Sequence, residues 1–258
     1  MSVPAAAASV AAAVGLVVEV AGPCISFTLR DGSAVGGVAR GSGAGSGSPD
    51  LAAAMEDCLR GLPGDVRIVL LHDLHQLHEL HELHEHLDSG ELGRWSRVAR
   101  RLSERADLLS VALLAGRTSG LGLALALACD LRVMADDAAL RLADTRAGRV
   151  PVLGTASALV GAVGYANALW LCLTGEPVTA AEAARLGLVA RVVPARELDA
   201  EADRLTAHLL AGPRDAVTET KALLAGVAAR SGPAAVRQHE AETDALTRLL
   251  GTSARNAG

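Results

Sequence analysis

The chain has 258 residues, of which half are hydrophobic and only 2% are aromatic, and its formal net charge is −5. This length is enough for one large domain with a sizeable core built from Leu, Val and Ala. The scarcity of aromatic side chains and the negative charge argue against a nucleic-acid partner, which needs base stacking or a basic surface.

The cysteines and the N-terminal segment bear on the compartment. The four cysteines are scattered without a C-x-x-C pair, so neither a disulfide framework nor a cysteine metal site is indicated. Residues 1–18 carry no side-chain charge, but they lack the basic start of a signal peptide and Pro4 interrupts them. We therefore expect a cytoplasmic protein with a flexible lead-in over residues 1–15 and no membrane span. The cysteines are Cys24, Cys58, Cys129 and Cys172.

The first half of the chain predicts strands that alternate with helices. Two short β-type runs around a Gly-Pro turn predict a hairpin, and a segment rich in Gly and Ser predicts a loop. Proline after Ser48 marks the start of a helix. The expected elements are strands at 16–20 and 24–29, a loop at 31–47, a helix at 49–62, a strand at 66–71, a helix at 91–107 and a strand at 109–114.

The second half predicts a helical tail. Thr179 to Glu182 forms a capping box, and Gly187 ends the helix that follows. Strands and helices that alternate before a purely helical segment indicate an α/β domain with an appended helical module. The expected elements are helices at 154–163 and 165–173, a strand at 188–193, and tail helices at 196–211, 213–229 and 233–250.

The run from His72 to Gly90 repeats a His-x-Leu triplet and contains six of the eight histidines. Imidazoles three residues apart on a helix could share a zinc or nickel ion, although no pair has the spacing of the H-E-x-x-H motif. Alternatively, the run is a low-complexity expansion that forms a polar surface loop, helical or not.

Residues Leu108 to Leu159 contain an apolar strand, a glycine turn and a helix made almost wholly of Ala and Leu. A helix that is apolar on every side must be buried. Its first N–H groups, at Gly120, Leu121 and Gly122, would then lie inside the protein without a side-chain cap. These donors need an acceptor, and a substrate oxygen is one candidate.

Three segments resemble the enoyl-CoA hydratase/isomerase, or crotonase, superfamily. They are SGLGLALALACDLRVMADDAALRLADTRAG, GYANALWLCLTGEPVTAAEAARLGLVARVVP and PRDAVTETKALL. The resemblance implies an α/β fold, a crotonase-like ββα spiral over 16–195, with a C-terminal helical module over 196–258 that forms homotrimers or homohexamers. It also implies an acyl thioester substrate, carried by coenzyme A or a carrier protein, and no metal or further cofactor.

In this family two backbone N–H groups hold the thioester oxygen and stabilise an enolate. The resemblance implies that the second donor lies at Leu121, between Gly120 and Gly122. A helix N-terminus suits this role because its dipole favours negative charge. The alternative is that these N–H groups meet only water or a neighbouring loop.

The acid–base residues depart from the family pattern. Hydratases of the family use two glutamates, and this chain has Ala124 and Asp144 at their positions. Val152 stands at a third acidic position, used by some isomerases and dehalogenases. Because Ala124 cannot exchange a proton, the two-glutamate hydration is not expected, and one carboxylate remains.

Two binding loops also differ from the family. The His-x-Leu repeat stands where the family carries its first oxyanion donor and a contact to the CoA adenine. The family's glycine-rich turn is reduced to Pro151-Val152-Leu153-Gly154, which fills space that a substrate tail would use.

Asp144 then has two interpretations. It could move a proton in an isomerase-like reaction, where one acid–base group serves both steps. It could instead cap a turn or pair with Arg146 or Arg149. We interpret Asp130 as structural and Arg117 as a turn residue that reaches either a phosphate or solvent.

Three functions follow from these residues. The first is a divergent crotonase that acts on an acyl thioester in specialised, polyketide-type metabolism, as an isomerase or a lyase. The second is a non-catalytic protein that assists a partner enzyme, similar to the crotonase-like accessory proteins of dihydroxyphenylacetyl-CoA formation. The third is a histidine-rich metal-binding module.

Overall fold

The computed structural model describes residues 14–30, 51–78 and 89–230, and it contains two β-sheets. The large sheet has the order β1-β2-β3-β4-β6-β9, in which β1 and β2 are antiparallel and all other neighbours are parallel. The small sheet has the order β5-β7-β8. The strands are β1 (Leu16–Ala21), β2 (Cys24–Leu29), β3 (Ile68–His72), β4 (Leu109–Leu114), β5 (Arg117–Ser119), β6 (Leu131–Ala135), β7 (Ala139–Arg141), β8 (Val178–Thr179) and β9 (Arg191–Val193).

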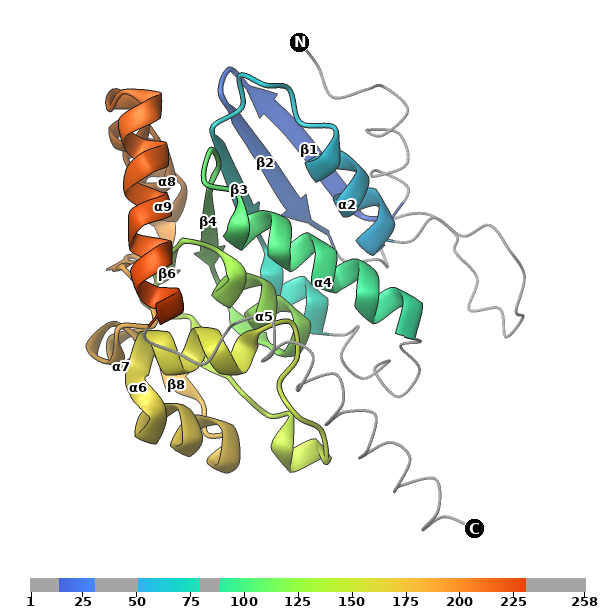
Figure 1. The fold of residues 1–258 in the computed structure, drawn as a ribbon. Helices are drawn as coiled ribbons and strands as arrows, with labels where there is room; N and C mark the ends of the chain where they lie inside the picture. Colours follow the sequence, from blue (N-terminus) through green and yellow to red (C-terminus); the bar gives the residue numbers. More distant parts are fainter. Residues whose placement is uncertain (1–13, 31–50, 79–88, 231–258) are drawn as a thin grey trace.

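Helices cover the large sheet. In Figure 1, α2 and α4 lie beside each other in front of the sheet, and α8 and α9 run along its left side. The helices are α2 (Leu51–Arg60), α4 (Ser89–Glu104), α5 (Gly120–Ala128), α6 (Thr155–Thr174), α7 (Ala180–Leu186), α8 (Leu198–Ala211) and α9 (Arg214–Arg230). Short 3₁₀ helices are η1 (Leu74–His78), η3 (Thr145–Ala147) and η4 (Ala195–Glu197).

Helix α5 lies at the centre of the molecule, and seven of its nine residues are buried. It packs against η1, α4 and α6. Its alanines leave little side-chain volume, which lets these neighbours approach it from several sides. At its C-terminal end, the Arg132 guanidinium donates to the carbonyls of Ala126 at 3.2 Å and Cys129 at 2.7 Å. A cation is stabilising at this end of a helix dipole.

A partly buried ionic contact joins α9 to the sheet. The Lys221 ammonium donates to the Leu108 carbonyl and to Asp130 Oδ2, both at 2.7 Å. Asp130 Oδ2 also accepts from the Ser110 N–H at 2.8 Å. Asp130 thus has a structural position, as the sequence indicated.

The predicted elements of the described ranges are present, but some of their ends shift. Strand β3 begins at Ile68, because the Val66 N–H turns back to the Pro63 carbonyl at 3.1 Å. Strand β9 is confined to Arg191–Val193 instead of 188–193, because the Leu188 N–H closes the end of α7. The capping box is confirmed, since Thr179 Oγ1 accepts from the Glu182 N–H.

The start of the His-x-Leu repeat corrects one expectation. Residues Leu74–His78 form η1, and both Leu74 and Leu77 are only 1% exposed. A 3₁₀ helix has three residues per turn, so a three-residue repeat places these leucines on one face. This part of the repeat is therefore a core element and not a polar surface loop. Residues 79–88 lie outside the described ranges, as do the lead-in to residue 13, the loop at 31–47 and the tail helix at 233–250.

Helix α6 is broken at Gly164, whose φ is 74°, which separates the two helices predicted here. It is also the one helix of the described residues that is long and apolar enough to cross a membrane, by length and composition alone. Several large apolar side chains on it face outward. They are Val160, Tyr165, Leu169, Trp170 and Leu173.

Candidate functional site

The N-terminus of α5 has no side-chain cap. Ser119 occupies the N-cap position with extended backbone, yet its side chain makes no cap hydrogen bond. Gly120 has a φ of 52°, a left-handed conformation that glycine adopts without strain. The first-turn N–H groups of this helix thus have no side-chain acceptor at the N-cap, as the sequence predicted.

Gly122 brings η1 close to this helix end. A Cβ atom at residue 122 would lie 2.2 Å from the Leu74 carbonyl oxygen, closer than real contacts allow. Glycine is therefore required for this packing. The family resemblance places the first donor loop in the segment after β3. In this protein the Leu74 carbonyl of that segment packs against α5.

A groove of about 430 Å³ opens beside Ser119. Its walls come from η1 and from the small sheet, and two arginines and a histidine lie among them. The residues that line it are His75, Gln76, Arg117, Thr118, Ser119, Ala139, Leu140, Arg141 and Pro177.

Asp144 lies apart from the groove lining. It occupies the N-cap position of η3, three residues after the end of β7, and is partly buried. Burial and the nearby Asp144 carboxylate raise the pKa of the Cys172 thiol, so the carboxylate lies near this part of α6. The Arg146 guanidinium donates to the Thr174 carbonyl at 3.1 Å. Ser119, the residue before Gly120, lines the groove, whereas Gly120, Leu121, Gly122 and Asp144 are not among the residues of its wall.

Helix α5 itself offers no acid–base group. Ala124 is 5% exposed and lies in the core. At the C-cap, burial raises the pKa of the Cys129 thiol to about 12, so it stays protonated at neutral pH. Proton transfer at this site must therefore come from outside α5.

Leu153 fills space near the start of α6. Its φ is 60°, which is unusual for a residue other than glycine, and its side chain is 6% exposed. The following Gly154 also has positive φ, at 78°. The backbone thus keeps the shape of a glycine turn while a leucine side chain packs into the core.

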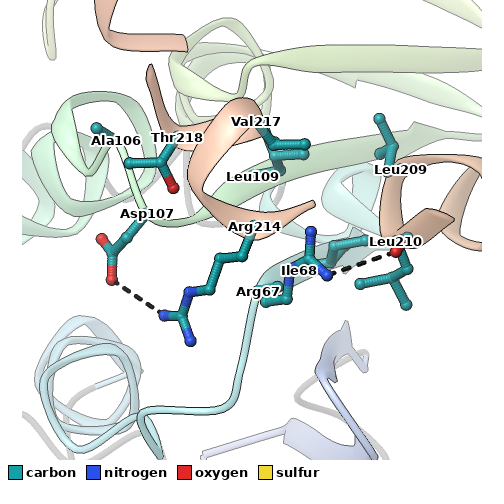
Figure 2. Close-up of a pocket in the computed structure, with 10 residues that line it drawn as sticks. All are labelled: Arg67, Ile68, Ala106, Asp107, Leu109, Leu209, Leu210, Arg214, Val217 and Thr218. Carbon is teal, nitrogen blue, oxygen red and sulfur yellow. Dashed lines mark hydrogen bonds and ion pairs between the residues drawn. The ribbon is translucent and has the colours of Figure 1, made fainter. Parts of the chain in front are cut away.

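Two other hollows are less suited to an acyl thioester. One of about 560 Å³ is lined by four carboxylates, which would repel the phosphates of coenzyme A. The other, of about 10 Å³, lies where α8 and α9 meet the starts of β3 and β4 (Figure 2), and it has room for little more than a water molecule. There the Arg67 guanidinium donates to the Gly212 carbonyl at 3.0 Å, and Arg214 lies 3.8 Å from Asp107. These contacts tie the helices to the sheet.

The sequence indicated Arg117 as a turn residue that reaches either a phosphate or solvent, but it did not place His75 and Arg141 in the same site. Because side chains alternate along a strand, the sequence could have placed Arg117 and Ser119 on one face. It could not have placed Arg141 beside them, because the pairing of β5 with β7 joins residues that are distant in the sequence. In the part of the chain that the structure describes, no cluster of three His, Cys, Asp or Glu side chains could hold a metal ion.

The molecule is thus an α/β protein of two sheets that presents an uncapped helix N-terminus beside a basic groove. The sequence profile of the enoyl-CoA hydratase/isomerase family matches residues 80–258, and the chain belongs to this family.

Curated relatives match the chain over part of their length. A probable enoyl-CoA hydratase of Mycobacterium bovis is 44% identical over 93 residues, which cover 36% of each chain. A methylglutaconyl-CoA hydratase of Pyricularia oryzae is 31% identical over 160 residues, which cover 57% of this chain and 46% of that protein. The matches therefore span less than half the length of these relatives.

Solved structures match almost the whole chain. A putative enoyl-CoA hydratase from Thermobifida fusca in complex with acetoacetyl-CoA is 29% identical, has a TM-score of 0.70, and is matched over 97% of this chain and 100% of its own. A structure of a putative enoyl-CoA hydratase from Thermobifida fusca in complex with CoA is 30% identical, with a TM-score of 0.70 and coverage of 98% and 99%. An enoyl-CoA hydratase from Mycobacterium avium subsp. paratuberculosis K-10 has a TM-score of 0.72 at 24% identity, with coverage of 92% and 90%. These likenesses confirm the crotonase-like α/β fold with C-terminal helices.

Proposed function

We propose that this protein binds an acyl thioester with its carbonyl oxygen at the N-terminus of α5 and stabilises the enolate that forms there. The observation that carries the proposal is the buried, uncapped helix end at Ser119, which opens beside a groove of about 430 Å³. N–H groups held in place before the reaction stabilise developing negative charge most strongly where water is excluded. The Thermobifida fusca relative, which binds CoA and acetoacetyl-CoA, supports this ligand class.

The proposed proton-transfer group is Asp144. With Ala124 in the place of one family glutamate, a reaction that needs two carboxylates is disfavoured, whereas an isomerase-like transfer needs one. We place this activity in specialised, polyketide-type metabolism, on a CoA or carrier-protein thioester.

An assisting role beside a partner enzyme is the second candidate. It is favoured by the position of Asp144 outside the groove lining and by Leu153, which fills the turn before α6. In that role the protein would keep the thioester site and have no proton-transfer activity of its own.

Binding is tested with a ligand pair, which leaves the protein intact. Calorimetry would compare butyryl-CoA with the thioether analogue in which a methylene replaces the carbonyl. We expect the thioester to bind about 10-fold more tightly, because only its oxygen accepts from the helix N–H groups. Equal affinities, or no binding of either ligand, would show that the helix end does not hold the carbonyl.

Proton transfer is tested by exchange of the α-hydrogens of butyryl-CoA in D₂O, followed by mass spectrometry. We expect Asp144→Asn to slow exchange about 100-fold or more while the dissociation constant changes little. If the wild-type protein binds the thioester but causes no exchange, Asp144 is not catalytic and the assisting role is the better one.

The compartment and the assembly are part of the proposal. All four cysteines are free thiols, which suits a reducing cytoplasm. We also propose a homotrimer or homohexamer, with residues 196–258 as the oligomerisation module. The outward apolar side chains of α6 and α9 supply surface for such contacts.

A further inference from the structure

The groove beside Ser119 is basic, although the chain as a whole is acidic. Two arginines and one histidine lie among the nine residues that line it, and none of the nine is acidic. The chain carries a net charge of −5, so this local excess of positive charge is not a consequence of composition. It calls for an anionic ligand.

Sheet geometry aims both arginines into the groove. Strands β5 and β7 are parallel, and their register pairs Arg117 with Ala139 and Ser119 with Arg141. Side chains two residues apart on a strand share a face, and so do register partners. The alternate residues Thr118 and Leu140 also line the groove but are only 1% exposed each, so the exposed side chains that the two strands offer a ligand are those of Arg117 and Arg141.

Both guanidinium groups keep hydrogen-bonding capacity for a ligand. Arg141 Nε donates to the Gly175 carbonyl at 2.9 Å, which orients the side chain and leaves its terminal nitrogens free of ion pairs within the described residues. Arg117 is exposed and forms no ion pair with any acid in residues 14–30, 51–78 or 89–230. An arginine fork matches the two oxygens of a carboxylate.

His75 closes the third side of the groove. Its ring packs against Gly116, where a Cβ atom would lie 3.4 Å from the ring Cγ. Its Nε2 lies 3.0 Å from Gln76 Nε2, and its Nδ1 lies 3.9 Å from Asp73 Oδ1. The ring and the Gln76 amide add polar groups to the same wall.

The distance from the helix end identifies which part of the ligand carries the charge. Arg141 is the register partner of Ser119, so its Cα lies about 4.8 Å from that of the α5 N-cap residue. The phosphates of coenzyme A are separated from the thioester carbonyl by the whole pantetheine arm. Because the Arg141 backbone lies this close to the carbonyl site, we take the charge that its side chain binds to belong to the acyl group.

We propose that Arg117 and Arg141 bind a carboxylate at the far end of the acyl group, so that the substrate is the thioester of a short dicarboxylic acid. This inference rests on the proposed function, because it takes the thioester carbonyl to lie at α5. Arg117 and Arg141 then determine substrate specificity, and the N–H groups of α5 hold the carbonyl.

The test compares glutaryl-CoA, pentanoyl-CoA and free CoA by calorimetry with the full chain. The first two have acyl chains of equal carbon number and differ in the terminal carboxylate. We expect the wild-type protein to bind glutaryl-CoA about 10-fold or more tightly than pentanoyl-CoA, because a charged hydrogen bond is lost in the second. Arg141→Gln should remove most of this preference while pentanoyl-CoA affinity stays the same, which also shows that the variant is folded.

Arg185→Gln is the matched control, since Arg185 is exposed on α7 and lies outside the groove lining. It should keep the preference for glutaryl-CoA. Equal binding of glutaryl-CoA and pentanoyl-CoA by the wild-type protein would overturn the inference and leave the proposed function standing. If Arg141→Gln weakens all three ligands equally, the groove holds the CoA phosphates and the inference is wrong. No binding of either thioester would instead refute the proposed function.

Discussion

Gly122 controls how closely η1 approaches the helix that carries the proposed donors. A side chain here would meet the Leu74 carbonyl oxygen at 2.2 Å, and a backbone atom cannot swing aside as the end of a flexible side chain can. The nearby Gly120 has positive φ, so two of the three residues in the glycine turn have separate physical reasons for being glycine.

Gly122→Ala should destabilise the protein by about 1–3 kcal/mol, because the added methyl group overpacks a closed contact. A loss of stability is informative, because alanine within a helix is ordinarily more favourable than glycine by about 1 kcal/mol. Urea denaturation measures the free energy of unfolding. Gly161→Ala is the control: no atom lies within 4 Å of its added Cβ, so it should be neutral or stabilising. Equal effects of the two substitutions would contradict the close approach of η1.

At the scale of elements, the contact of Lys221 with Asp130 fixes α9 against the sheet. The two side chains are only 10% and 20% exposed, and Asp130 also binds Ser110. The ends of β4 and β6 and the middle of α9 thus meet at one carboxylate. Lys221 is the chain's only lysine, so the reactivity of lysine side chains toward a reagent reports on this contact alone.

Asp130→Asn should lower the free energy of unfolding by about 3 kcal/mol, because it leaves a mostly buried ammonium without its counter-charge. It should also speed the reaction of Lys221 with an amine-acylating reagent, as α9 opens more often. Denaturation and peptide mass spectrometry measure the two effects. Glu182→Gln, which removes an exposed ion pair with Arg185, should change stability by less than about 1 kcal/mol. A Lys221 reaction rate that is unchanged in Asp130→Asn would contradict the docking role.

The sequence predicted elements whose signals are local. The hairpin at 16–29, the capping box at Thr179 and the uncapped start of α5 each depend on neighbouring residues, and each is present. The contacts of Arg141 could not be predicted, because they require the register of β7 on β5 and the later position of Gly175. Burial of Leu74 was missed because a histidine-rich repeat has the composition of a surface loop, while its period matches a 3₁₀ helix.

At the scale of the whole molecule, α6 presents an apolar surface that the described chain does not cover. Tyr165 is 69% exposed, Trp170 is 61% exposed and Leu173 is 56% exposed. Only 22% of the helix's most apolar window is buried within the protein. The break at Gly164 divides the helix into two short pieces, a shape better suited to a protein contact than to a membrane span.

We expect light scattering after size exclusion to give the mass of a trimer or hexamer, and Trp170→Glu to shift the protein toward the monomer. A charge buried in an apolar interface without a partner weakens assembly strongly, by about 10-fold or more in the dissociation constant. Fluorescence gives a second measurement, because Trp95 is only 2% exposed and its emission reports on the core. Comparison of the wild-type protein with Trp170→Phe isolates the emission of Trp170, which should shift to the blue on assembly. Arg185→Glu alters an exposed charge on α7 and should leave the mass unchanged. A wild-type protein that is monomeric at micromolar concentration would refute the proposed assembly, whereas an oligomer that survives Trp170→Glu would place its interface away from α6.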